Sequence, residues 1–172
     1  MKHLVIAWME DKPGVLTRVA SLFRRRGFNI ESLVVGHSET PGISRMTFVV
    51  EGDDRTMQQV ESQLNKLINV TAVEDVTAMP AVVREMALVK VAAEGGTART
   101  EVMQMAEVFR AKIVDVGHSA LTLEVTGEEE KVESLIGLLK RFGILEVTRT
   151  GQVAMVRASA RENGAGHPAS DN

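Results

Sequence analysis

Residues 8–33 read WMEDKPGVLTRVASLFRRRGFNIESL and combine a helix start with a helix stop. Pro13 has a fixed φ and no N–H, which suits the first position of a helix, and Asp11 can complement the unbonded amides there. Apolar residues recur after it at spacings of three and four: Val15, Leu16, Val19, Leu22 and Phe23. Gly27 follows three arginines, whose charges suit the negative end of a helix. The stretch predicts an amphipathic helix that begins at Pro13 and ends before Gly27.

The start of this helix has the chemistry of a small-ligand site. Gly14 has no side chain, and the amides of Gly14, Val15 and Leu16 have no acceptor within the helix, which favours a bound anionic group. Asp11 places an acceptor beside those donors, so a carboxylate and an ammonium could be bound together, as an α-amino acid requires. The alternative interpretation of the same motif is a turn and helix cap without a ligand.

The rest of the first half alternates between strand and helix patterns. Apolar runs bounded by turn residues predict four strands, at 3–9, 28–35, 44–50 and 70–78. A second amphipathic helix is expected over 57–68, after the turn and acidic signal of Gly52-Asp53-Asp54. The order β-α-β-β-α-β is that of the ferredoxin-like fold, in which two helices cover one face of a four-stranded antiparallel sheet. Met79-Pro80 is the expected domain boundary.

The second half repeats this order. Strands are expected at 85–92, 112–116 and 121–125, helices from Thr97 or Thr100 to Phe109 and at 128–142, and a closing strand or hairpin at 144–156. Short matching motifs, such as Gly36-His37-Ser38 and Gly117-His118-Ser119, support a duplication. The second half has Glu94-Gly95-Gly96-Thr97 in place of the Asp-x-Pro-Gly motif, so it is not expected to bind the same ligand.

These patterns predict an α+β chain of two ferredoxin-like domains. We expect the first at 1–79 and the second at 80–157, followed by a disordered tail at 158–172, because the end of the chain is rich in Ala, Gly, Ser and Asn and lacks periodicity.

Composition excludes several classes of function. The chain has 172 residues, a formal net charge of -3 and 3% aromatic residues with no tyrosine, so an RNA-binding domain of this topology would lack its stacking platform and its positive charge. There is no cysteine for a disulfide, a thiolate metal site or a thiol nucleophile. No apolar stretch of about 18 residues occurs, and we expect a soluble cytoplasmic protein.

Polar clusters do not assemble into a catalytic centre. The four histidines lack the spacing of a metal site, and Glu128-Glu129-Glu130 is more simply explained as favourable charge at a helix start. We therefore predict no enzyme, no metal site and no cofactor in this chain. The three arginines before Gly27 could bind a phosphate or an acidic partner, or could be a solvated helix end. Arg45 lies in an apolar strand, and Glu31 on the neighbouring strand is a candidate partner.

The run from Glu10 to Leu33, followed by Val34-Val35-Gly36 and Ser44-Arg45-Met46-Thr47, closely resembles the regulatory (small) subunit of acetolactate synthase, also called acetohydroxyacid synthase. The pattern is more specific than the Asp-x-Pro-Gly-x-Leu signal of ACT domains in general. The resemblance extends over about residues 1–157 and is strongest in the first half.

This resemblance implies a role that composition and periodicity do not. The first domain would be an ACT domain that binds an amino-acid effector and forms a homodimer, and the second would contact the catalytic (large) subunit. The chain would be a non-catalytic regulatory subunit in branched-chain amino acid biosynthesis, which activates the catalytic subunit and confers feedback inhibition by valine. Thiamine diphosphate, Mg²⁺ and FAD would belong to the catalytic partner. The alternative is a stand-alone ACT-type amino-acid sensor that acts on another partner.

The resemblance also implies which residues contact the effector. The site would lie between a loop of one chain, with Asp11, Gly14, Val15 and Leu16, and a strand of the other, with Asn29, Ile30 and Gly36. Members of the family commonly carry asparagine at the place of Asp11, so valine, isoleucine and leucine all stay open as effectors.

Overall fold

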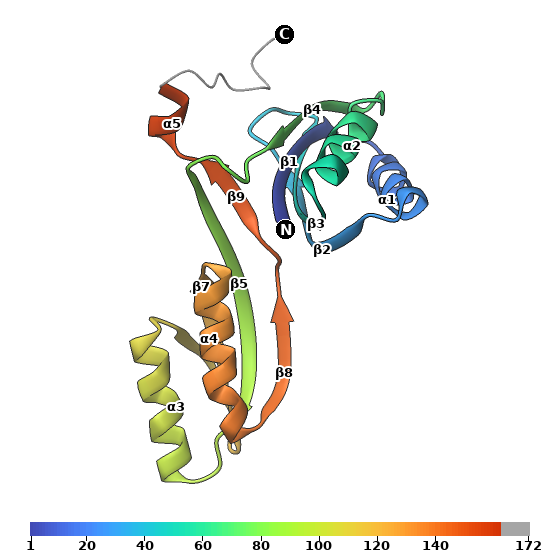
Figure 1. Cartoon of the computed structure of the whole chain (residues 1–172). Coiled ribbons are helices and arrows are strands. Elements are labelled where there is room, and N and C mark those ends of the chain that lie inside the picture. Colours follow the sequence, from blue (N-terminus) through green and yellow to red (C-terminus); the bar gives the residue numbers. More distant parts are fainter. Residues whose placement is uncertain (163–172) are drawn as a thin grey trace. The chain divides into compact units, whose positions relative to one another are not determined.

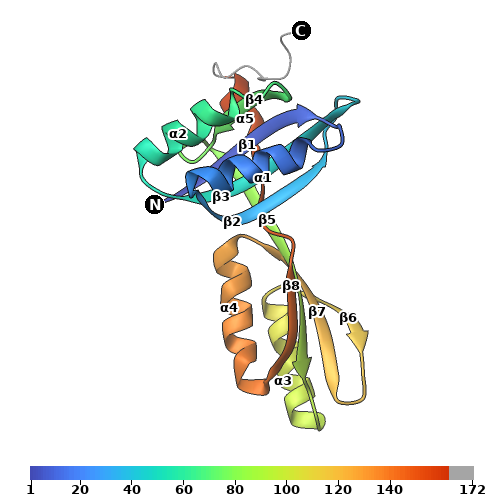
Figure 2. The same ribbon diagram turned by 90° about the vertical axis from the view of Figure 1, so that its right-hand side faces the viewer.

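The computed structural model describes residues 1–162, which form two β-sheets with helices packed on them (Figure 1). The first sheet has four antiparallel strands in the order β2-β3-β1-β4, so β2 and β4 are its edges. Its elements follow one another as β1 (Lys2–Glu10), α1 (Val15–Arg26), β2 (Asn29–His37), β3 (Ile43–Glu51), α2 (Asp54–Leu64) and β4 (Val70–Asp75). Both helices lie on one face of this sheet (Figure 2), over a core that includes Val5, Phe48 and Phe23.

The start of α1 differs from the prediction. The helix begins at Val15 rather than at Pro13, because Pro13 and Gly14 form the centre of a turn in which the Val15 N–H donates to the Lys12 carbonyl at 3.3 Å. Proline at the second position and a glycine with φ 85° and ψ -8° at the third define a type II turn. The first helical bond runs from the Arg18 N–H to the Gly14 carbonyl.

The end of α1 is as predicted. Gly27 has φ 69°, in the left-handed region, and the Phe28 N–H donates back to the Phe23 carbonyl at 3.2 Å. This is the Schellman arrangement that glycine favours at a helix end. The chain therefore turns at once from α1 into β2.

α2 begins with a side-chain cap. The Asp53 carboxylate accepts hydrogen bonds from the hydroxyl and the backbone N–H of Thr56, and these bonds lower the pKa of Asp53. Met57, Val60 and Leu64 then turn one face of α2 to the sheet.

The second sheet repeats the first topology. Its elements are β5 (Ala81–Ala92), α3 (Gly96–Val108), β6 (Lys112–Val116), β7 (Ala120–Gly127), α4 (Glu129–Leu139) with a 3₁₀ turn (Lys140–Phe142), and β8 (Ile144–Arg149). The strand order β6-β7-β5-β8 corresponds to the order of the first sheet. Two ferredoxin-like folds of the α+β class are therefore confirmed. The possible closing hairpin is not formed, because β9 (Val153–Val156) pairs with β5 and not with β8.

The chain forms two compact units whose limits differ from the expected domains. Of the described residues, 1–82 and 152–162 make up the first unit, and 83–151 make up the second. Residues 152–157, which we expected in the second domain, therefore group with the first. A short helix, α5 (Ala158–Glu162), occupies the first residues of the expected disordered tail, and the remainder of that tail lies outside the described residues. Within residues 1–162, no helix is long and apolar enough to cross a membrane.

The C-terminal strap, residues 152–157, covers the face of the first sheet that α1 and α2 leave open (Figure 1). Because Val5, Ala7 and Met9 of β1 point into the core under the helices, the residues between them point to the opposite face. Three large apolar residues of that face are nevertheless buried: Ile6, Trp8 and Val49. Ala154 and Val156 of the strap are buried as well. The first sheet is thus covered on both faces.

Arg45 holds the strap on the sheet. Its guanidinium donates to the Ala154 carbonyl at 2.5 Å, and its Cζ lies 5.6 Å from the centre of the Trp8 ring. The prediction that Arg45 pairs with Glu31 is wrong, because the register places Arg45 opposite Gly36, roughly 16 Å along the strand from Glu31 at about 3.3 Å per residue. Glu31 pairs with Lys2 at 2.9 Å instead.

Removal of the strap should destabilise the first unit. A chain that ends at Gly151 uncovers Ile6 and Trp8 and should lose about 3 kcal/mol of stability, as expected for the exposure of one or two large apolar side chains. Thermal unfolding by circular dichroism would measure this loss, and Trp8, the single tryptophan, should emit at longer wavelength. A chain that ends at Arg157 keeps the strap and is the control. Equal melting temperatures for the two truncations would contradict a structural role of the strap.

Candidate functional site

The turn before α1 leaves backbone donors exposed at one end of the first sheet. Gly14 and Leu16 are exposed, and the hydrogen bonds of residues 1–162 include none from their backbone amides. The Val15 amide is taken up by the turn, and the Val15 side chain is buried in the core, so Val15 has a structural part in this turn. No side chain of the described residues caps the start of α1. Two amides at the positive end of a helix are therefore available to an anionic group.

Two exposed polar side chains, those of Asp11 and His37, lie at the same end of the sheet as these amides. The Asp11 carboxylate lies 3.1 Å from Nδ1 of His37, and the two side chains are 46% and 85% exposed. The Asp11 N–H donates to the Gly42 carbonyl at 2.8 Å, which ties the turn to the connection between β2 and β3. An exposed carboxylate thus stands beside the amides, as an α-amino acid with its ammonium and carboxylate groups requires.

A network of polar side chains connects the residues on both sides of the turn. The Asn69 side chain donates to the Glu10 carboxylate and accepts from Arg18 of α1 at 2.7 Å. The hydrogen bond from Asn69, together with the Lys12 ammonium 3.1 Å away, lowers the pKa of Glu10. The network joins β1, α1 and the segment before β4, so the residues on both sides of the turn are positioned by long-range contacts. Asn69 had no local signal in the sequence, because its partners lie 51 and 59 residues away.

The predicted site residues fall into two groups within one chain. Asp11, Gly14 and Leu16 lie at the end of the sheet where β2 finishes, and Gly36 lies at the same end, next to His37. Asn29 lies at the other end of β2, where its amide donates to Glu51 at 3.2 Å. Asn29 and Gly36 are roughly 23 Å apart at about 3.3 Å per residue. Ile30 packs against the core near Asn29. A single chain therefore does not bring the two groups together.

β2 is an edge strand with an exposed apolar surface. Leu33 and Val35 stand opposite Phe48 and Met46, hence on the helix side of the sheet, yet they are 40% and 39% exposed. Leu16 of α1 is 45% exposed on the same side. An edge strand with unpaired backbone groups and apolar side chains is suited to pair with another strand.

The corresponding place in the second unit is occupied by a side chain. α3 starts after Gly95, and the Arg99 guanidinium donates to the carbonyls of Gly117 and His118, both at 2.8 Å. These carbonyls belong to the connection between β6 and β7, which corresponds to the β2–β3 connection beside Asp11. In the second unit the Arg99 side chain thus joins these two segments, whereas in the first unit they are joined by the backbone bond from Asp11 to Gly42.

Metal binding has no support in the described part of the chain. Residues 1–162 contain no group of three or more His, Asp or Glu side chains placed to hold a metal ion. His3 is buried, and its Nδ1 lies 3.4 Å from the Asp75 carboxylate. These two side chains have no third potential metal ligand beside them among the described residues.

Comparison with known proteins finds two family models that match successive parts of the chain. Residues 6–72 match the model of an AHAS small subunit-like ACT domain, and residues 84–158 match that of the small subunit of acetolactate synthase. The probable acetolactate synthase small subunit of Methanothermobacter thermautotrophicus is 53% identical over 157 residues, which are 91% of this chain and 94% of that protein. This chain belongs to the acetolactate synthase small-subunit family. The resemblance noted from the sequence is thereby confirmed.

Other members of the acetolactate synthase small-subunit family are also similar to this chain in sequence and in structure. The probable small subunit of Archaeoglobus fulgidus is 51% identical over 161 residues, 94% of this chain and 100% of that protein. The crystal structure of the small subunit from Thermotoga maritima has a TM-score of 0.84 at 46% identity and covers 91% of this chain and 98% of its own. The ACT domain at residues 6–72 contains the α1 turn and the whole of β2.

Gly14→Ala should destabilise the first unit through its backbone. Open space surrounds Gly14, but its φ of 85° lies in the left-handed region, so a Cβ there costs about 1–2 kcal/mol. Urea unfolding would measure the loss. Gly36→Ala is the matched control, since Gly36 is also in open space and lacks a positive φ. An unchanged midpoint for Gly14→Ala would contradict the requirement for glycine in the turn.

Proposed function

We propose that this chain is the regulatory subunit of an acetolactate synthase, which binds the catalytic subunit, raises its activity and confers feedback inhibition by valine. The likeness to named small subunits, at 53% identity over nearly the full length of both chains, supports this most strongly. The chain itself would be non-catalytic and act in the cytoplasm in branched-chain amino acid biosynthesis. Thiamine diphosphate, Mg²⁺ and FAD would be bound by the catalytic partner.

The effector site in this proposal is formed by two copies of the first unit. If the β2 edges of two chains pair antiparallel about a two-fold axis near Leu33, Asn29 of one chain comes opposite His37 of the other, and Ile30 opposite Gly36. That pairing would unite the two groups of site residues, which lie far apart within one chain. The exposed apolar edge formed by Leu33 and Val35 supports it.

The chemistry of the united site suits a small α-amino acid. The carboxylate of the ligand would accept from the amides of Gly14 and Leu16, and its ammonium would lie against Asp11. Exposed apolar side chains of Leu16 and Leu33 are available to a branched aliphatic side chain, which supports valine over a polar amino acid. Asn29 would supply an amide donor and acceptor from the second chain.

Inhibition requires that valine bind one arrangement of the regulatory dimer more tightly than another. A coupling of about 1–3 kcal/mol is typical of allosteric proteins. In the proposal, the interface at β2 is the element with two arrangements, because valine contacts both chains there. The domain at 80–157 would contact the catalytic subunit and sense the change. Deletion of all residues after Met79 should abolish activation, but it also removes the strap from the first unit.

The deciding measurement is acetolactate formation by the cognate catalytic subunit. Activity should rise when this chain is added and should fall again as valine is titrated, because the regulatory dimer is proposed to activate and valine to reverse the activation. Activation without any effect of valine, isoleucine or leucine would contradict the proposed effector site. The proposed catalytic partner would still be supported by that result. A chain that binds valine and leaves the catalytic subunit unaffected would be a stand-alone sensor, and the proposed function would be wrong.

Mixed dimers test whether one site contains two chains. Asp11→Ala and Asn29→Ala should each lower valine affinity about tenfold or more as homodimers, because each removes a hydrogen bond to a charged ligand. After the two variants are mixed at equal concentration, half of the dimers combine both chains, and each of these has one intact site and one doubly altered site. About one quarter of all sites should therefore regain native affinity in calorimetric titration.

The control for mixing is Asp54→Ala, an exposed carboxylate on α2, which should neither lose affinity nor change it when mixed. If the mixture of Asp11→Ala and Asn29→Ala chains recovers no tight sites, the two residues belong to the same chain's site and the two-chain arrangement is excluded.

A further inference from the structure

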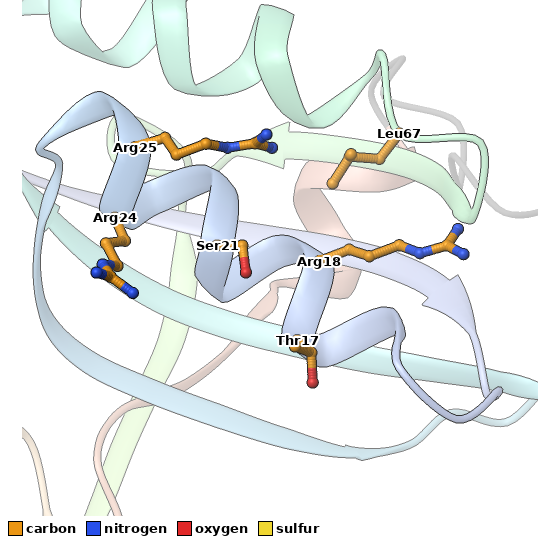
Figure 3. A pocket seen from close by; sticks show the side chains of 6 residues that line it. All are labelled: Thr17, Arg18, Ser21, Arg24, Arg25 and Leu67. Carbon is orange, nitrogen blue, oxygen red and sulfur yellow. The ribbon is translucent and has the colours of Figure 1, made fainter.

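A groove bordered by arginines runs along the exposed face of α1 (Figure 3). Its volume is about 660 Å³, and it is lined by Thr17, Arg18, Ser21, Arg24, Arg25 and Leu67. A smaller hollow of about 280 Å³ shares Arg25 with it and adds Arg26 and Gln63 of α2. Together these hollows form the α1 groove, which follows α1 from Thr17 near its start to Arg26 at its end.

The arginines of the α1 groove form no ion pair with the carboxylates that the structure describes. Arg18 donates to the Asn69 amide oxygen and Arg26 to that of Gln63, both uncharged acceptors. Within residues 1–162, no ion pair involves an arginine of α1, whereas three arginines of the second unit contact carboxylates: Arg84, Arg141 and Arg149. The chain as a whole carries a formal charge of -3. A local excess of positive charge in an acidic chain favours an acidic partner.

The arrangement of the arginines does not suit a single phosphate. Figure 3 shows Arg18 and Arg25 extending toward the segment that carries Leu67, whereas Arg24 points away from it. Arg18 and Arg25 are seven residues apart, which is roughly 10 Å along a helix. The groove reaches the last turn of α1, where the helix dipole is negative, and a compact anion prefers convergent donors at a helix start. Dispersed positive charge suits an extended segment with several carboxylates.

Apolar surface adjoins the charges. Leu67 is half-buried at the groove, and Ile68, the next residue, is 89% exposed. The aliphatic stems of the arginines add to this apolar surface. An apolar side chain next to a charged groove can bind a protein segment, but it adds nothing to the binding of a small anion.

We propose that the α1 groove docks an acidic segment of the catalytic subunit, with an apolar side chain of that segment against Ile68. This inference rests on the proposed function and adds a contact from the first unit to the contact proposed for the domain at 80–157. The same helix offers its first amides to the effector, so one rigid element would bear the effector site at its start and the partner toward its end.

The test measures the concentration of full-length chain that half-maximally activates the cognate catalytic subunit. The double variant Arg24→Gln/Arg25→Gln should require about tenfold more chain at low salt, because two charges that steer and hold the partner are lost. Its dependence on NaCl between about 50 and 300 mM should be weaker than that of the native chain. Ile68→Ser should raise the required concentration by about threefold to tenfold without changing the salt dependence. Valine affinity should be unchanged in both.

Two controls separate docking from folding. Arg55→Gln removes an exposed arginine of α2 outside the groove and should behave as the native chain. Arg24→Lys/Arg25→Lys keeps the charge and should restore activation to within about threefold of native, which a purely structural role of the two arginines would not require.

The possible results are distinct. If the native chain activates the enzyme and the double glutamine variant activates equally well, the groove proposal is wrong and the proposed function stands. If the native chain has no effect on the catalytic subunit, the proposed function fails and the docking proposal with it. If inorganic tripolyphosphate binds the chain in an Arg24- and Arg25-dependent manner while Ile68→Ser has no effect on activation, the occupant is a small polyanion and the acidic-segment proposal is overturned.

Discussion

Burial on both faces is the constraint on which the first unit depends. β1 is apolar on both sides, and Val49 of β3 is buried on the face away from the helices, so one face of the sheet takes α1 and α2 and the other needs a second cover. The C-terminal strap supplies it, held by the bond from Arg45 to the Ala154 carbonyl and by the bond from the Gln152 N–H to the Ser32 hydroxyl at 2.8 Å. The second face of the first sheet is therefore covered by residues that follow the whole of the second unit in the sequence.

This return connects the strap with the strands that bear the proposed effector site. Arg45 stands opposite Gly36, and Ser32 lies in the middle of β2, so the strap contacts the strand whose edge carries Asn29 and Ile30. Two residues that hold the strap, Ser32 and Arg45, therefore belong to β2 and to the strand paired with it. The physical route from the β2 edge to the residues that follow the second unit is short, and it lies within one compact unit.

The two units share one topology and differ at one corresponding place. The strand order is β2-β3-β1-β4 in the first unit and the corresponding β6-β7-β5-β8 in the second. In each unit a glycine precedes the first helix. In the first unit the helix start remains open beside Asp11, whereas in the second the Arg99 side chain bonds to the facing carbonyls. The fold supplies a helix start at a sheet end, and the residues at that place decide whether a ligand can reach it.

Local patterns in the sequence determined the elements, the duplicated topology and the exposed donors at Gly14 and Leu16, because helix and strand periods, prolines and glycines act within a few residues. They placed the start of α1 two residues early, since Pro13-Gly14 fits a type II turn as well as a helix start. Tertiary structure alone decided the partner of Arg45, the network at Asn69, the return of residues 152–157 and the separation of Asn29 from Asp11. Each depends on contacts between residues far apart in the chain, which strand register and burial select and local sequence does not encode.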